Sequence, residues 1–339
     1  MLILTEAEIR DLVDVDGARA AVAGAFRALH RGDATIANVI SLPFARPRGA
    51  VHIKAGHIHE DAVWTAKFSG DFYPDDGSPT RHSGVMFVSS AMDGSLLGVL
   101  VDNGYLTELR TGAAGAIAAD LLAREDASSV AIIGAGSQAR YQLDALLKVR
   151  AIERVSVASR STARAEAYGA HIESTYALPA QVFETAEAAV HDAHIVITTT
   201  PANTPLVQAG WLSPGAHVTA VGSDEPTKQE LAPEVLALAA VIAVDDRRQA
   251  AHLGELHHAI ERGLLEEGDV VTLGELLADE VPGRTDKDQI TVADLTGVGV
   301  QDAAIAALAL RRALAEQALR LDTQSDDGAA RASLFAEDD

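Results

Sequence analysis

One short stretch has small residues at a spacing that suits the binding of a phosphate group. It reads Gly134-Ala135-Gly136-Ser137-Gln138-Ala139, the G-x-G-x-x-A form of the dinucleotide-binding fingerprint. Gly134 allows a tight turn, Gly136 lets a pyrophosphate approach the backbone, and Ala139 lets the next helix pack closely. A strand-like run precedes the loop, and a helix opening at Ser137 directs its N–H groups toward the phosphates. We expect a nucleotide site at Gly134, Gly136, Ser137, Gln138 and Ala139, with a purely structural glycine turn as the alternative.

The second strand of such a unit indicates which dinucleotide binds. An acidic residue at its end would hold the ribose 2′-hydroxyl of NAD(H) and repel a 2′-phosphate. Here the strand ends Ala158-Ser159-Arg160-Ser161, with Arg164 one helical turn further on. A guanidinium can pair with a 2′-phosphate, and a serine can add a hydrogen bond. Arg160, Ser161 and Arg164 therefore favour NADP(H), while NAD(H) stays possible.

Composition excludes several other functions. The chain has 339 residues, no cysteine and a formal net charge of −22, which would repel a phosphate backbone. We therefore expect no nucleic-acid partner, and no disulfide or thiolate chemistry. The sequence has neither an apolar run of about 18 residues nor the basic start of a signal peptide. These features favour a cytoplasmic protein without a membrane partner.

The order of elements predicts an α/β protein of two domains. Helical patterns cover Thr5 to Arg31, where Thr5 and Glu8 form a capping box. Short strand-like runs follow to about Leu100, with a hairpin turn at Asp93-Gly94, and then one helix spans Thr107 to Leu122. Beyond residue 126, strands alternate with helices, which predicts a doubly wound parallel sheet of the Rossmann type. A final helix begins at Asp302, where an N-cap role competes with a functional one.

Several longer segments resemble those of one enzyme family. They are GAGSQA, DNGYLTELRTGAAGAIAADLLA, VGSDEPTKQEL and ITVADLTGVGVQDAAIA. Together they are similar to the ornithine cyclodeaminase/mu-crystallin family over nearly the whole chain, and most similar to its ectoine-utilisation branch. The resemblance implies a homodimer, with an α+β substrate and dimerisation domain at 1–122 with 303–339. A Rossmann domain at 123–302 would bind the cofactor.

The resemblance also implies a role for individual residues. Lys67 matches a lysine that holds the substrate α-carboxylate near the reacting carbon, and Arg110 matches an arginine that holds the same group. Asp224 matches the acid/base aspartate that moves a proton to or from the substrate nitrogen. The residues expected to contact the cofactor are Thr111, Thr200, Val221, Gly222 and Val298. A buried lysine needs an anion, which agrees with a functional Lys67.

Lys54 departs from the family pattern. It lies at a position where ornithine cyclodeaminase has a glutamate for the distal amine, and a lysine there would repel a terminal ammonium. Lys54 suits a second acidic group instead. We therefore expect an NAD(P)H-dependent imino-acid (ketimine) reductase or amino-acid dehydrogenase that moves hydride at an amino-acid α-carbon. A cyclodeaminase that releases ammonia and recycles NAD, possible in ectoine or hydroxyectoine breakdown, is the first alternative. A non-catalytic NADPH-binding protein is the second.

Twelve histidines raise the question of a metal. His252, His257 and His258 share one segment, and His52, His57 and His59 share another, but neither has the H-E-x-x-H pattern. We expect no metal site.

Overall fold

The computed structural model describes residues 1–73 and 81–322. The polar and acidic sequence of 323–339 predicts a mobile tail, and this segment lies outside the described residues. The contacts divide the chain into two compact units. Unit 1 comprises 1–21, 32–107 and 299–339, and unit 2 comprises 22–31 and 108–298. The domains predicted from the sequence have other limits, 1–122 with 303–339 and 123–302. These limits stay a prediction, because a division by contacts does not test them.

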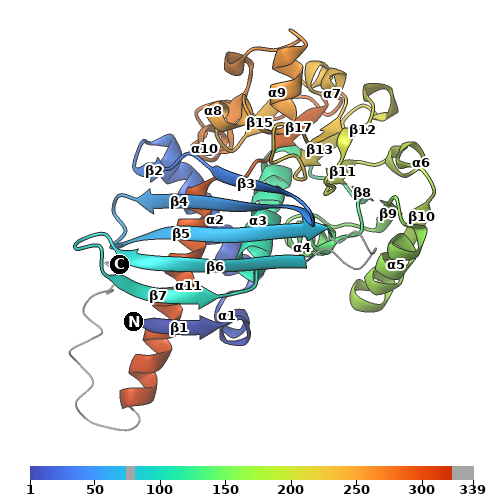
Figure 1. The fold of residues 1–339 in the computed structure, drawn as a ribbon. Coiled ribbons are helices and arrows are strands. Elements are labelled where there is room, and N and C mark those ends of the chain that lie inside the picture. Colours follow the sequence, from blue (N-terminus) through green and yellow to red (C-terminus); the bar gives the residue numbers. More distant parts are fainter. Residues whose placement is uncertain (74–80, 323–339) are drawn as a thin grey trace. The chain divides into compact units, whose positions relative to one another are not determined.

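Unit 1 is built on a mostly antiparallel sheet with the strand order β1-β7-β6-β5-β4-β2, and β3 pairs with β4 (Figure 1). Its strands are β1 (Leu2–Thr5), β2 (Ala34–Ile36), β3 (Ile40–Ala45), β4 (Arg48–Ile58), β5 (Val63–Tyr73), β6 (Arg81–Ser90) and β7 (Leu96–Val101). Within the described part of this sheet, the β1–β7 pair is parallel and the other pairs are antiparallel. The predicted turn at Asp93-Gly94 is confirmed, since Gly94 has φ +74° between β6 and β7.

Helices α1 (Glu6–Leu12), α2 (Val15–His30), α3 (Tyr105–Leu122) and α11 (Gly299–Asp322) complete the frame, and the division between the units falls inside α2 and α3. The Thr5–Glu8 capping box is present. Helix α11 crosses one face of the sheet (Figure 1). Alternate residues of β4 are buried on one face, which gives the strand the period-2 pattern of a half-covered sheet. The final helix begins at Gly299, three residues before the predicted Asp302, so Asp302 is not its N-cap.

Unit 2 contains a fully parallel sheet with the order β10-β9-β8-β11-β13-β17-β15-β16. The strands are β8 (Ser129–Ile133), β9 (Arg154–Ala158), β10 (Ala180–Phe183), β11 (Ile195–Thr198), β13 (His217–Ala220), β15 (Val241–Val244), β16 (Val271–Thr272) and β17 (Thr291–Asp294). From β8 the chain runs outward through β9 and β10 and then returns to β11 on the other side. Ligands of doubly wound sheets bind at the carboxyl ends of the strands beside such a switch.

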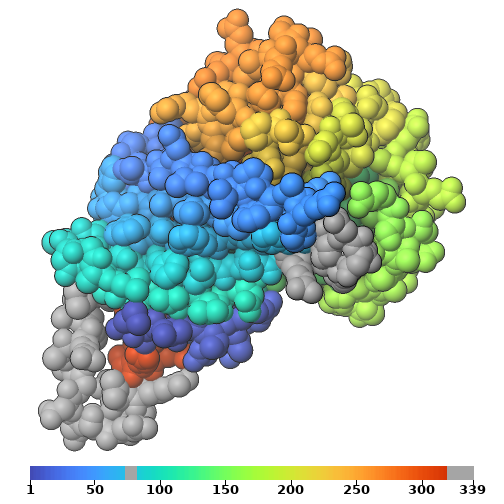
Figure 2. Space-filling model, in the orientation of Figure 1, coloured from blue at the N-terminus to red at the C-terminus, as the bar shows by residue number. Residues whose placement is uncertain are grey.

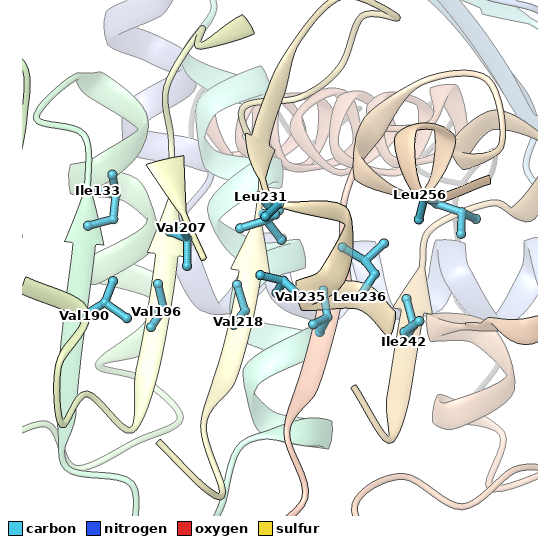
Figure 3. Close-up of a cluster of buried hydrophobic side chains, with 14 of the residues drawn as sticks. Ile133, Val190, Val196, Val207, Val218, Leu231, Val235, Leu236, Ile242 and Leu256 are labelled. Carbon is cyan, nitrogen blue, oxygen red and sulfur yellow. The ribbon is translucent and has the colours of Figure 1, made fainter. Parts of the chain in front are cut away.

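Both faces of this sheet carry an apolar core. One core includes Leu143, Tyr168 and Ile172 of helices α4 (Ser137–Leu146) and α5 (Thr162–Tyr176). The other includes Val196, Val218 and Leu256 (Figure 3). Helices α6 (Ala186–Val190), α7 (Pro233–Leu238), α8 (Arg247–Ala250), α9 (Gly254–Glu261) and α10 (Leu273–Leu277), with the 3-10 turns Ala209–Trp211 and Glu267–Asp269, complete the unit. Helices on both faces confirm the predicted doubly wound α/β sheet.

Three short strands of unit 2 were not expected from the sequence, and one of them is β16 at the edge of the parallel sheet. Strands β12 (Asn203–Val207) and β14 (Gln229–Leu231) form a separate parallel ribbon. Strand β14 has only three residues and β12 contains Pro205, so neither shows a clear strand pattern. In the described part of the chain, no helix has the length and apolar character needed to cross a bilayer.

Candidate functional site

The glycine loop directly follows β8, and its first glycine is required by the backbone. Gly134 has φ +125°, and a Cβ placed there would lie 2.4 Å from Thr199 Oγ1. The Gly134 N–H donates to the carbonyl of Ala158 at the end of β9, 2.8 Å away. The loop is therefore fixed to its neighbouring strands, as a tight phosphate-binding turn must be.

Gly136 is in a different situation, because a Cβ there would meet nothing within 4 Å. It is the N-cap of α4, and no side chain caps the helix. The first N–H groups of the helix thus start beside open space, which fits an anion. Ala139 is fully buried, and its carbonyl accepts a 2.7 Å hydrogen bond from the Tyr168 hydroxyl, so the close packing predicted for this position is present.

Gln138 and Thr111 lie where α4 packs against α3. The Gln138 side-chain amide donates to the Glu108 carbonyl at 3.2 Å and also to the Glu108 carboxylate. Gln142 donates to the Thr111 carbonyl at 3.0 Å. The Gln138 side chain therefore fastens two helices, and any contact that it makes with a cofactor would use its backbone.

The end of β9 lies next to the glycine loop, because Ala158 is paired in register with Ile133. Arg160 and Arg164 are exposed, and Ser161 caps α5 by accepting a hydrogen bond from the Arg164 N–H at 3.4 Å. The first acidic residue after β9 is Glu166, inside the helix. Between the end of β9 and Glu166 the chain therefore carries two arginines and no carboxylate.

The ends of β11 and β13 meet at Thr200 and Gly222. A Cβ on Gly222 would lie 2.1 Å from the Thr200 carbonyl oxygen, so only glycine fits at this position. The Gly222 N–H donates to Glu230 Oε2 at 2.8 Å, and the Thr200 N–H donates to Glu230 Oε1 at 2.5 Å. Val221, between strand and glycine, is 8% exposed. Three predicted cofactor residues are thus gathered beside a glutamate that the sequence analysis missed.

Asp224 follows this turn and is held by a lysine. The Lys228 ammonium donates to Asp224 Oδ1 at 2.7 Å and lies 3.0 Å from Glu225 Oε1. The Lys228 side chain is 11% exposed, and the Ser223 hydroxyl donates to the Lys228 carbonyl at 2.7 Å. The acid/base candidate therefore carries a fixed cationic partner, which the i,i+4 spacing of D-E-P-T-K could have revealed.

Arg110 is buried against the turn that follows β17. A Cβ on Gly297 would lie 2.7 Å from an Arg110 guanidinium nitrogen, and Gly297 has φ +78°. Asp245 accepts hydrogen bonds from Thr296 Oγ1 at 2.8 Å and from the Gly297 N–H at 2.5 Å, so this turn is rigidly held. Val298 is fully buried. The glycine thus makes room for a guanidinium.

In unit 1, two lysines lie side by side on the buried face of the sheet. Lys54 on β4 is directly opposite Lys67 on β5, and they are 6% and 1% exposed. The Lys67 ammonium donates to Asp302 Oδ1 at 3.0 Å, and Asp302 is also fully buried. Sequence reasoning found both lysines but missed Asp302 as a partner, because the two residues are 235 positions apart.

Among the residues that the structure describes, one group of three side chains could offer metal ligands. The ligand atoms of His257, His258 and Glu261 lie within 4.8 Å of one another. His258 Nε2 is already 2.7 Å from the Lys228 carbonyl, and His257 Nε2 is 3.5 Å from Glu261 Oε1. These contacts occupy part of the ligand set, and the absence of a metal stays a prediction.

Comparison with known proteins supports the interpretation of these motifs. The family model for the ornithine cyclodeaminase/mu-crystallin family matches residues 1–317. A protein of Sinorhizobium fredii (strain NBRC 101917 / NGR234), described as an uncharacterized cyclodeaminase, is 43% identical over 92% of this chain and 96% of its own.

Two solved structures share the fold over 94% of this chain and 97% of theirs. One is an archaeal alanine dehydrogenase dimer with bound NAD, with a TM-score of 0.86 and 36% identity. The other is the iminosuccinate reductase of Paracoccus denitrificans in complex with NAD+, with a TM-score of 0.83 and 28% identity. None of these comparisons tests the resemblance to the ectoine-utilisation branch. The chain belongs to the ornithine cyclodeaminase/mu-crystallin family.

Proposed function

We propose that the protein is a nicotinamide-dependent imino-acid reductase, which also runs in reverse as an amino-acid dehydrogenase. The observation that carries this proposal is the pair of buried lysines, Lys54 and Lys67, beside the carboxylate of Asp302. Two ammonium groups opposite each other on a sheet form a strongly cationic surface, and an acidic substrate carries the opposite charge.

The residues of unit 2 fit a nicotinamide dinucleotide. The open side of Gly136 and the uncapped start of α4 suit its pyrophosphate. Arg160, Ser161 and Arg164 suit a 2′-phosphate, so the proposal favours NADP(H). The two solved relatives contain NAD, so the preference for NADP(H) depends on these residues of the present chain alone.

In the proposed reaction, the reduced nicotinamide supplies the hydride for the imine carbon. Lys67 binds the α-carboxylate, with Asp302 holding its ammonium in place. Arg110, whose guanidinium lies against Gly297, is the second residue proposed for carboxylate binding. Asp224 provides or orients the proton for the substrate nitrogen, and Lys228 fixes one of its oxygens.

Lys54 points to the substrate class. A terminal ammonium, as in ornithine or lysine, would be repelled by a buried lysine, whereas a second carboxylate or an acyl oxygen would be attracted. An open-chain dicarboxylic imino acid fits best. The 43% identity to a protein described as a cyclodeaminase favours cyclodeamination as the second candidate.

The proposal includes a homodimer formed through the outer face of the unit 1 sheet. This face, opposite α11, carries exposed apolar residues at Ile40, Leu42 and Phe44 of β3 and at Phe68 of β5. The segment that contains β3 lies on the visible surface in blue in Figure 2. Adjoining apolar side chains of this size are typical of an interface. The archaeal alanine dehydrogenase relative is itself a dimer.

The test is the loss of near-ultraviolet absorbance of NADPH or NADH with purified protein and a panel of imino acids. The panel holds iminosuccinate, a cyclic imino acid, and 2-oxo acids mixed with ammonia or methylamine. We expect steady oxidation of NADPH, fastest with the dicarboxylic substrate. Ammonia release from an amino acid without net cofactor change would instead establish a cyclodeaminase. Cofactor binding without any turnover would establish a non-catalytic binding protein.

A further inference from the structure

Glu230 is a fully buried glutamate on β14 that no role proposed so far uses. Its carboxylate accepts three hydrogen bonds: from Thr198 Oγ1 at 2.8 Å, from the Thr200 N–H at 2.5 Å, and from the Gly222 N–H at 2.8 Å. Thr200 follows β11 and Gly222 follows β13, so one side chain fastens the turns after two neighbouring strands. Burial raises the pKa of Glu230, and the three donors act in the opposite direction.

A second carboxylate holds Glu230 itself in place. Glu255, at the start of α9, accepts hydrogen bonds from the backbone N–H groups of Glu230 at 2.7 Å and Leu231 at 3.0 Å. Asp294 at the end of β17 in turn accepts from the Leu256 N–H at 2.9 Å. Hydrogen bonds therefore connect the central sheet to α9 and α9 to β14, which carries Glu230. All of these elements belong to unit 2.

The two turns lie on one side of the switch point. The glycine loop after β8 and the arginines after β9 are on the adenine and phosphate side, whereas Thr200, Val221 and Gly222 follow β11 and β13 on the other side. A dinucleotide that crosses the carboxyl ends of the sheet places its second half over β11 and β13. In the proposed function, that half is the nicotinamide.

We propose that Glu230 is a positioning residue that shapes the nicotinamide half of the cofactor site by holding the turns at Thr200 and Gly222. This inference rests on the proposed function. A carboxylate is needed, because both of its oxygens accept from backbone N–H groups. A glutamine would turn an amide donor toward one of those N–H groups in either orientation, so one turn would lose its acceptor.

The experiment compares two ligands in the full-length protein. One is NADPH, and the other is 2′-phospho-ADP-ribose, which lacks the nicotinamide ring. In Glu230→Gln we expect NADPH to bind about 10-fold more weakly, because part of its binding free energy must restore the turn that has lost its acceptor. The nicotinamide-free ligand should bind within about 2-fold of wild type, because the glycine loop is untouched.

Thr198→Val provides the matched control. It removes the hydroxyl that donates to Glu230 Oε2 but keeps the hydrogen bonds of Glu230 with the Thr200 and Gly222 N–H groups. The affinities for both ligands should therefore stay within about 2-fold of wild type. Equal weakening of both ligands in Glu230→Gln would show a general structural role and overturn the inference, as would wild-type affinity for both.

Glu230→Asp keeps the charge on a side chain one methylene shorter, and it carries the same test if Glu230→Gln fails to fold. It should show the same selective loss of NADPH affinity, and an unchanged ratio of the two affinities would overturn the inference. A failure of the proposed function can be told apart from a failure of this inference. The first would appear as absence of turnover in the wild-type protein, whereas the binding comparison needs no substrate.

Discussion

Charged side chains buried inside the two units have partners that lie elsewhere in the chain. Lys67 is held by Asp302, and Glu230 by groups on the two turns that it fastens. Removing one member of a buried ion pair is costly, since the other charge is left without compensation. The side chains for which we propose a role in the reaction or in the cofactor site are therefore also tied to the stability of the fold.

Asp294 offers a direct test of a buried carboxyl group. It is 1% exposed, and burial raises its pKa from 3.8 to about 7, helped by the nearby charges of Asp245 and Glu230. The folded protein thus keeps a proton that the unfolded chain releases above about pH 4. The stability due to this proton is complete at lower pH and is lost as the pH rises through about 7.

Asp294→Asn should abolish this part of the pH dependence while keeping an acceptor for the Leu256 N–H. Urea unfolding at about pH 5 and pH 7.5 would measure it. Between these values the wild type should lose more unfolding free energy than the variant, with a ceiling of roughly 3 kcal/mol, because about two pKa units of the shift fall between pH 5 and pH 7 at about 1.4 kcal/mol per unit. Burial and the charge of Asp294 both raise the pKa of Glu255, so the two carboxyl groups titrate as a coupled pair and the difference between the profiles belongs to that pair. Parallel pH profiles would contradict the assignment.

At the scale of elements, every cofactor residue predicted from the parallel sheet follows the carboxyl end of a strand. The glycine loop follows β8, Arg160 follows β9, Thr200 follows β11, Gly222 follows β13 and Val298 follows β17. The two glycines of the loop nevertheless have different requirements. The backbone demands the first, and only an incoming ligand would demand the second.

This difference predicts opposite phenotypes. Gly136→Ala should fold with an unchanged melting temperature, because its methyl group meets nothing, but should bind NADPH at least about 10-fold more weakly. Gly134→Ala should be destabilised by about 2 kcal/mol or more, since φ +125° and the contact with Thr199 exclude a side chain. Thermal melts and NADPH titrations of both variants would decide. Unimpaired cofactor binding by folded Gly136→Ala would argue against a pyrophosphate beside this loop.

The periodicity of apolar residues and the turn-forming residues between them were enough to predict the parallel sheet, the first helices and the glycine loop. They did not predict β12 and β14. Strand β14 has only three residues, and β12 has five with a proline among them, so neither shows a clear alternation of apolar and polar residues. Nor could they predict Glu230 or Asp302 as partners. Hydrogen bonds between residues 32 or 235 positions apart leave no local pattern, and Asp302 resembled a helix cap when judged from its neighbours alone.

For the whole molecule, the outer face of the unit 1 sheet predicts self-association. Leu42 and Phe44 are 58% and 38% exposed on β3, so changing both to Asp should not disturb the core. We expect a wild-type dimer at micromolar concentration and a monomer for Leu42→Asp/Phe44→Asp, measured by sedimentation. Met92→Asp is the control, since Met92 is 88% exposed in the turn between β6 and β7. A wild-type monomer, or a double variant that stays dimeric, would refute this interface.

The long separation between Lys67 and Asp302 has a consequence for how a cell makes the protein. Unit 2 ends at residue 298, so a ribosome has delivered all of it before α11 emerges. The unit 1 sheet is synthesised early but lacks the helix that covers its inner face, and the ammonium of Lys67 lacks Asp302, until α11 leaves the ribosome. Domains generally fold as units during synthesis. We therefore expect unit 2 to fold while α11 is still being synthesised, whereas the unit 1 sheet stays exposed to chaperones and proteases until α11 covers it.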